Sequence, residues 1–232
     1  QLITQMNYQT IEEYFTQFPD DINQIIVEFA SDHLPDLSRF YKLKRLVCIN
    51  NQLTCLPLLP SSLITLYCSG NQLTCLPLLP STLEILHCYN NQLTYLPLLP
   101  STLVILFCSQ NQLTYLPLLP STLKILWCTN NKLIYLPPLP STLDTLSCSS
   151  NQLICLPSLP YTVETLYCSN NSFYYYTEKD ELTMSEYITI FRKQIEIINQ
   201  FKHLFYSLKY KKQFHNWLWV RVREPKIRKR YH

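Results

Sequence analysis

Inward and outward positions alternate in one short segment that recurs along the middle of the chain. In the segment TLYCS, Leu66 and Cys68 alternate with Thr65, Tyr67 and Ser69. A period of two residues predicts a strand that sends one set of side chains into a core and the other outward. We therefore expect Leu66 and Cys68 inside, and Thr65, Tyr67 and Ser69 on the open face.

The segment belongs to a unit that recurs every 20 residues. The block SSLITLYCSGNQLTCLPLLP is followed by STLEILHCYNNQLTYLPLLP, STLVILFCSQNQLTYLPLLP, STLKILWCTNNKLIYLPPLP and STLDTLSCSSNQLICLPSLP. A degenerate unit begins near Lys42, and a last one, YTVETLYCSNNSFYYY, makes seven. A fixed period of this length is typical of a solenoid, in which each unit stacks on its neighbours and shares a core with them.

Aligned, the units share the pattern LxxLxCxxNxLxxLPxLPxx, which matches the leucine-rich-repeat signature position by position. Residues 43–176 therefore resemble the shortest, 20-residue class of leucine-rich repeats, known from bacterial secreted effectors. We expect an α/β fold: a leucine-rich-repeat solenoid with a short-stranded parallel sheet on the concave face, an extended convex side and helical caps at both ends. The near-identical units and the Asn-rich and Tyr-rich style also resemble leucine-rich-repeat proteins of giant viruses of the mimivirus type.

Leucines, asparagines and prolines of the unit have separate structural roles. Leucines beside the strand, such as Leu63, Leu73 and Leu76, are expected to fill the interior. LPxLP restricts φ to about −65° and removes amide donors, which favours an extended return on the convex side. An asparagine after each strand can bond backbone groups that a tight turn leaves unpaired. The asparagines are Asn51, Asn71, Asn91, Asn111, Asn131, Asn151 and Asn171.

The chain has ten cysteines. Parallel stacked side chains disfavour disulfides, and no paired CxxC motif suggests zinc, so we expect reduced core thiols and a reducing compartment such as the cytosol. Seven cysteines occupy the inward strand column: Cys48, Cys68, Cys88, Cys108, Cys128, Cys148 and Cys168. The remaining three share a second column with tyrosines, which predicts packing there too: Cys55, Cys75 and Cys155, with Tyr95, Tyr115, Tyr135 and Tyr175.

The flanking residues 1–42 and 177–232 do not continue the period. Residues 10–15 and 20–29 have amphipathic patterns with acidic first turns, which predict helices that cap the first repeat. At the other end, Thr183 and Glu186 form a capping box ahead of a second predicted helical cap. Its apolar residues recur at a spacing of three or four: Phe191, Ile195, Ile198, Phe201, Phe205 and Leu208.

Residues 18–42 also resemble an F-box, through FPDDI, the apolar residues after it and DLSRFYK. F-box proteins with leucine-rich repeats have this domain order and recruit substrates to Skp1-cullin ubiquitin ligases. The segment departs from the F-box pattern, because Phe18 replaces the usual leucine and the closing tryptophan is absent. The resemblance implies an alternative function, an adaptor that binds a host Skp1-like protein through residues 18–42.

Two outward columns carry side chains that the fold does not prescribe. One reads Val47, Tyr67, His87, Phe107, Trp127, Ser147 and Tyr167, and the other Arg45, Thr65, Ile85, Ile105, Ile125, Thr145 and Thr165. Contiguous exposed apolar patches mark interaction sites, and aromatic residues dominate interface energetics. Strand propensity, cross-strand stacking or a helix folded over this face would explain the same pattern without a partner. We predict a protein-binding site of Tyr67, Ile85, His87, Ile105, Phe107, Ile125, Trp127 and Tyr167.

Composition excludes several enzyme classes. The single glycine, Gly70, leaves no P-loop, dinucleotide fingerprint or GxSxG elbow. Residues 46–172 contain five formally charged residues, no two acids share a repeat, and His87 has no nucleophile or orienting group. We predict no catalytic residue, no metal site and no cofactor.

Charge is distributed unevenly along the chain, although the net charge is only +3. Residues 201–232 contain ten Lys or Arg and one acid, with Trp217 and Trp219 among them. Such a segment can contact nucleic acid or an acidic membrane surface, and it leaves a structural or nucleic-acid-associated role as an alternative. A solvated tail is favoured, and no run of about 18 apolar residues predicts a membrane span. The expected partner is a host protein met in the cytoplasm.

Overall fold

The computed structural model describes residues 10–27, 31–173, 188–190, 192–197, 199–200, 204 and 208–211. The chain divides into two compact units, Gln1–Ile188 and Thr189–His232. The repeats lie in the first unit.

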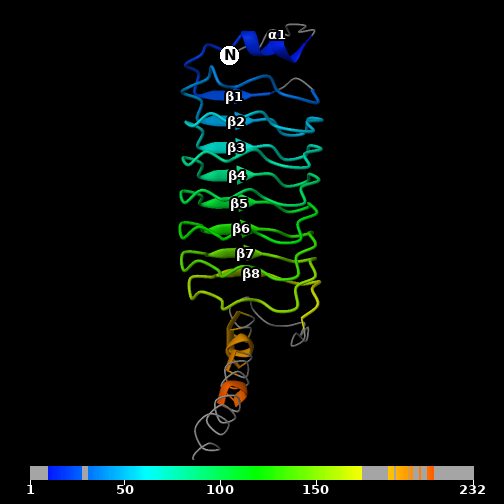
Figure 1. Ribbon diagram of the computed structural model, residues 1–232, viewed down its shortest axis with the longest axis vertical. Helices are drawn as coiled ribbons and strands as arrows, with labels where there is room; N and C mark the ends of the chain where they lie inside the picture. Colours follow the sequence, from blue (N-terminus) through cyan, green and yellow to red (C-terminus); the bar gives the residue numbers. More distant parts are fainter. Residues whose placement is uncertain are drawn as a thin grey trace, which may run out of the picture. The chain divides into compact units, whose positions relative to one another are not determined.

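Eight three-residue strands form one parallel sheet whose strand order is the chain order (Figure 1). They are β1 (Gln24–Ile26), β2 (Arg45–Val47), β3 (Thr65–Tyr67), β4 (Ile85–His87), β5 (Ile105–Phe107), β6 (Ile125–Trp127), β7 (Thr145–Ser147) and β8 (Thr165–Tyr167). From β2 onward, equivalent residues of neighbouring repeats are paired, as Leu66 is with Leu86. This arrangement confirms the predicted leucine-rich-repeat solenoid.

The core consists of leucines and cysteines stacked from repeat to repeat. Leu66, Cys68, Leu63 and Leu73 are all 0% exposed, and the same positions are buried throughout the repeats. The expectation that Thr65 and Ser69 are exposed is wrong: Thr65 is 9% and Ser69 0% exposed, and the Ser69 hydroxyl has no hydrogen-bond partner among the described residues. A serine between two much larger side chains of its column, at positions 49 and 89, is shielded from water.

Strand β1 adds one turn of the solenoid that the sequence pattern does not predict. We call each strand with its turn of the solenoid a rung. A helix was expected over residues 20–29, but residues 24–26 form a strand that pairs with β2 in parallel. Its central Ile25 is 0% exposed and lies in register with Leu46. The amides of Lys44 and Arg45 both donate to the carbonyl of Asn23, at 2.9 and 3.0 Å. The sheet therefore begins well before residue 43.

Residues after β1 complete an additional unit that precedes the one beginning near Lys42. Phe40 is 0% exposed and takes the position that Pro60 has in the next unit. The amide of Leu43 donates to Phe40 at 3.0 Å, as the amide of Leu63 donates to Pro60 at 3.1 Å. A different residue type therefore makes the same turn.

Helix α1 (Ile11–Thr16) lies beyond β1 at the N-terminal end of the stack (Figure 1). It begins at the N-cap Thr10, whose hydroxyl accepts a hydrogen bond from the Glu13 amide at 3.1 Å. The Tyr14 hydroxyl donates to the Ile26 carbonyl at 2.7 Å, and the rings of Phe15 and Phe40 are 6.1 Å apart. The helix thus covers the first rung, as predicted for a cap.

All described residues of the second unit are helical. This agrees with the helix expected after residue 183; of its predicted apolar positions, Ile195 is buried and Leu208 is 58% exposed. Several predicted features lie outside the described residues: Thr183, Glu186, Phe191, Ile198, Phe201, Phe205, Trp217, Trp219 and residues 212–232. Among the helices that the structure describes, none has the length and apolar character needed to cross a bilayer.

Candidate functional site

An asparagine ladder holds the turns after the strands in register, as predicted. The Asn71 amide group donates to the carbonyls of Cys48, Cys68 and Ser69 at 2.8, 3.1 and 3.2 Å. Its oxygen accepts from the Leu53 amide of the previous repeat at 3.0 Å. The same pattern recurs at Asn91, Asn111, Asn131, Asn151 and Asn171. Each of these six asparagines therefore joins two successive repeats, whereas the Asn51 amide group donates to the Ile49 carbonyl of its own repeat at 3.1 Å.

A second ladder, of threonines, was not predicted. The Thr82 hydroxyl lies 2.8 Å from the Ser61 carbonyl and 2.7 Å from that of Leu63, both in the preceding repeat. Thr102, Thr122, Thr142 and Thr162 repeat this contact. The Ser-Thr pair that follows the LPxLP segment at residues 81, 101, 121 and 141 was the available signal, although Ser62 and Tyr161 interrupt it at the two ends. The two ladders fix the spacing of the strands between them.

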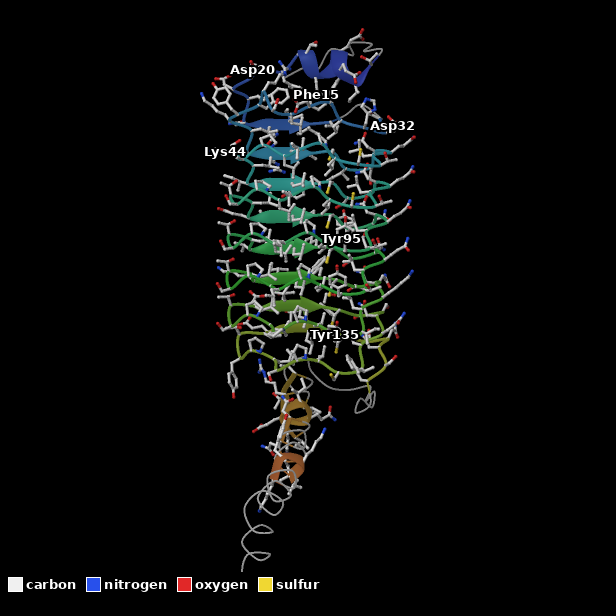
Figure 2. All side chains as sticks on the ribbon, viewed as in Figure 1. Phe15, Asp20, Asp32, Lys44, Tyr95 and Tyr135 are labelled. Atoms are coloured by element: carbon white, nitrogen blue, oxygen red, sulfur yellow. The ribbon has the colours of Figure 1, made fainter. Side chains whose placement is uncertain are left out.

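The inward cysteines form a continuous buried column, and sulfur atoms follow one another through the repeats (Figure 2). All ten cysteines are free thiols. Burial raises the pKa of Cys48 and of Cys108 to about 12, and raises the pKa of Cys68, Cys88 and Cys128 well above its ordinary range. These thiols therefore act as small apolar groups.

The second column of cysteines and tyrosines is not packed, contrary to prediction. Cys55 is exposed, and Tyr95, Tyr115 and Tyr135 are 44%, 47% and 60% exposed. Tyr95 and Tyr135 lie on the same side of the stack (Figure 2), and Tyr175 lies outside the described residues. The column follows the asparagine turn, where neither strand alternation nor a leucine fixes the direction of the side chain.

The predicted concave columns do come together on the sheet. Strand pairing places Tyr67, His87, Phe107 and Trp127 next to one another on β3 to β6. Tyr67 and His87 meet edge to face at 4.5 Å between ring centroids. The His87–Phe107 and Phe107–Trp127 rings are stacked, each pair at 4.3 Å. We call these four side chains the ring ladder.

The isoleucines of the site lie beside the ring ladder on the same strands. Ile85, Ile105 and Ile125 are adjacent in register and half-buried. Tyr167, on β8, is 52% exposed and is separated from the ring ladder by Ser147 on β7. The structure therefore brings seven of the eight predicted residues into one continuous patch and leaves Tyr167 apart from it, with β7 between them.

His87 is a ring of the ladder rather than a general base. Burial lowers its pKa below the ordinary value of 6.5, which favours the neutral imidazole between its ring neighbours. Among the described residues, no carboxylate lies within hydrogen-bonding distance of it. Nor does the described part of the chain contain a cluster of three His, Cys, Asp or Glu residues that could hold a metal ion.

Arg45 is part of this surface, although the predicted set omits it. Its guanidinium carbon lies 4.9 Å from the centroid of the Tyr67 ring, which extends the row of contacts from β3 to β2. Arg45 belongs to the same outward column as the isoleucines, so its position was predicted but its contact was not. Such cation–π contacts favour a fixed orientation of both groups.

A second exposed apolar surface escaped prediction as well. One leucine of each LPLLP segment points to solvent: Leu58, Leu78, Leu98 and Leu118 are 76%, 78%, 82% and 80% exposed. Because the LPxLP motif names only its outer leucines, the residue between them carries no structural requirement. This stripe serves below as a comparison surface.

Solved structures share this architecture. YopM from Yersinia enterocolitica WA-314 is 36% identical with a TM-score of 0.64, over 66% of this chain and 34% of that one. A Shigella effector leucine-rich-repeat domain is 35% identical with a TM-score of 0.51, over 63% and 62%. A functional domain of InlJ from Listeria monocytogenes, which includes a cysteine ladder, is 30% identical with a TM-score of 0.60, over 68% and 36%.

The chain thus spans between about one third and three fifths of the length of these solved chains. No protein-family model matches it, and no curated protein does. Its fold, its repeat pattern and these likenesses define it as a leucine-rich-repeat protein.

Proposed function

We propose that the chain is a protein-interaction module, without catalytic activity of its own, that binds a partner protein on its concave face. The ring ladder carries the proposal. It places four rings and the Arg45 guanidinium on consecutive strands, beside a row of half-buried isoleucines. The similarity to leucine-rich-repeat proteins supports an interaction role. The outward side chains of this chain would determine which partner it binds.

Stacking alone is an incomplete explanation for these rings. It covers their faces within the ladder, but Trp127 remains 42% exposed. Rigid aromatic side chains that are already held in place lose little entropy when a partner covers them. The same stacking therefore makes the patch a preorganised contact surface.

The test compares Phe107→Ser/Trp127→Ser with Leu98→Ser/Leu118→Ser, which removes two equally apolar side chains from the exposed leucine stripe. Both chains are used as baits for host-cell extract, captured proteins are identified by mass spectrometry, and affinities are then measured with each purified partner. We expect the first variant to bind at least about 100-fold more weakly, because two anchors each contribute about 2 kcal/mol.

The ring variant should still fold. Losing two stacked pairs costs about 1–3 kcal/mol, and the core leucines are untouched. Circular dichroism and denaturant unfolding check this. A partner that binds the ring variant and the leucine variant with equal affinity would place the binding site elsewhere.

The adaptor alternative draws less support from the structure. Apolar residues of the F-box-like segment are committed to the repeat stack: Ile25, Leu37 and Phe40 are 0% exposed and Val27 is 5% exposed. A Skp1-like protein would have to displace them from the solenoid. The nucleic-acid alternative depends on the basic segment, most of which lies outside the described residues.

A further inference from the structure

The ring ladder has two unlike ends. At β2 the Arg45 guanidinium lies over the Tyr67 ring and closes the row. At β6 the row stops with Trp127, because the next residue in register is Ser147. Among the described residues, the Trp127 ring contacts one other ring, that of Phe107.

One rung beyond Ser147 the column continues with Tyr167 on β8. Parallel strands are about 4.8 Å apart, so the backbones that carry Trp127 and Tyr167 are separated by about 9.6 Å. A planar group above Ser147 would lie about 4.8 Å from each side, close to the 4.3 Å separation of the stacked rings. We call this gap, bounded by Trp127 and Tyr167 and floored by Ser147, the Ser147 slot.

The floor of the Ser147 slot is polar. The Ser147 hydroxyl is 2.7 Å from that of Thr129. Thr145, the other outward residue of β7, donates from its hydroxyl to Asp144. Acceptor atoms on the floor favour a group with several N–H donors over a purely apolar ring.

The charged residues that precede the strands of the slot favour a cation. Asp144 and Glu164 occupy the same position in successive repeats, immediately before β7 and β8, and both are exposed. Lys124 has this position before β6, and within the described residues it forms no ion pair with either carboxylate. Two acids against one base leave a negative balance over the three strands that form the slot.

We propose that the Ser147 slot receives an arginine side chain of the partner protein. The guanidinium would stack between Trp127 and Tyr167 and face Asp144 and Glu164. Arginine is planar, stacks on aromatic rings and pairs with carboxylates through several donors, whereas the ammonium of lysine does not stack in this way. Arg45 on Tyr67 is the same contact made within the chain at the opposite end. This inference rests on the proposed function, because it names the group that the concave face would hold.

The direct test is a titration of the full chain with N-acetyl-arginine methylamide, followed through the Trp127 indole N–H resonance. Trp127→Phe assigns that resonance. We expect a saturable shift at about 1–10 mM, because several contacts of about 1 kcal/mol each, to two rings and two carboxylates, act on one guanidinium. The lysine analogue and the neutral 4-ethylphenol should shift it at least about fivefold less at equal concentration.

Two substitutions locate the contact. Ser147→Phe fills the slot with the residue that β5 carries at this position, and it should abolish the arginine-dependent shift. Ser147→Ala leaves the slot open and should retain it. Asp144→Asn/Glu164→Gln keeps the shape and should weaken binding about threefold to tenfold.

The absence of a shift, a shift retained in Ser147→Phe, or a stronger response to 4-ethylphenol or lysine would each overturn the arginine assignment. The purified partner separates this inference from the proposed function. A partner that is lost by Phe107→Ser/Trp127→Ser but binds Ser147→Phe at full affinity contradicts the slot and leaves the concave site in place. A partner unaffected by either variant contradicts the proposed function itself.

Discussion

Each asparagine of the ladder satisfies backbone groups in two repeats at once. Asn111 is 9% exposed, donates to Cys88 and Cys108 at 3.0 and 3.1 Å, and accepts from Leu93 at 2.9 Å. An amide is suited to this position because it offers two donors and an acceptor on one short side chain. The residue that makes the repeat recognisable in sequence is thus also the one that joins it to its neighbour.

Asn111→Ala should lower the free energy of unfolding by about 2–4 kcal/mol, because a buried amide and two carbonyls lose their partners together. Urea denaturation measures the change. Gln92→Ala, at the exposed position immediately after the ladder asparagine of the previous repeat, should stay within about 0.5 kcal/mol of the unmodified chain. Equal midpoints for the two variants would show that the ladder contributes little.

At the scale of elements, β1 is the unit that links the cap to the repeats. It offers one edge to β2, and α1 reaches it through the Tyr14 hydroxyl. Stability in a solenoid is shared between neighbouring rungs, so damage at one end is felt mainly there.

Ile25→Ser should destabilise the first rung selectively, because a fully buried isoleucine is replaced by a small polar residue at a cost of about 2–5 kcal/mol. Hydrogen exchange is the measurement. The amides of Lys44 and Arg45, which bond to Asn23, should lose protection while that of Cys108 keeps it. Ile26→Ser, at a position 42% exposed, is the matched control. Uniform loss of protection along the stack would mean that the chain unfolds as one cooperative body.

The sequence predicted the strands wherever the leucines, cysteine and asparagine of the unit recur every 20 residues. It missed β1 because its pairing with β2 is offset by 21 residues, and Phe40 stands where later units have proline. The candidate site, too, was predictable only where the repeat pattern fixes a position. Period two placed Phe107 and Trp127 on the open face, but the burial of Ser69 and the Arg45–Tyr67 contact depend on the sizes of side chains one repeat away.

For the whole molecule, the cysteine column reports on the integrity of the stack. Seven of the ten thiols are buried in one line through the repeats, while Cys55 is exposed and Cys75 and Cys155 are partly exposed. Burial raises the pKa of Cys108 to about 12, so almost none of it is thiolate at neutral pH.

In native conditions a thiol reagent such as Ellman's reagent should therefore modify Cys55, Cys75 and Cys155 at pH 8, and the buried column should react only in denaturant. Mass spectrometry of the labelled peptides distinguishes the two groups. The triple variant Cys55→Ser/Cys75→Ser/Cys155→Ser should not react with the reagent until it is unfolded. Rapid labelling of Cys108 in the native chain would show that the stack opens.

The constant pairing of residues 20 apart also bears on how such a chain can change over generations. The five repeats that begin at residues 81, 101, 121, 141 and 161 each contribute one member to the asparagine ladder, the threonine ladder and the cysteine column. Tandem copying or loss of one coding unit would lengthen or shorten all of these rows together and leave every junction intact. The concave face therefore grows or shrinks by whole repeats. Gain or loss of one repeat next to β7 would be enough to close or widen the gap after Trp127.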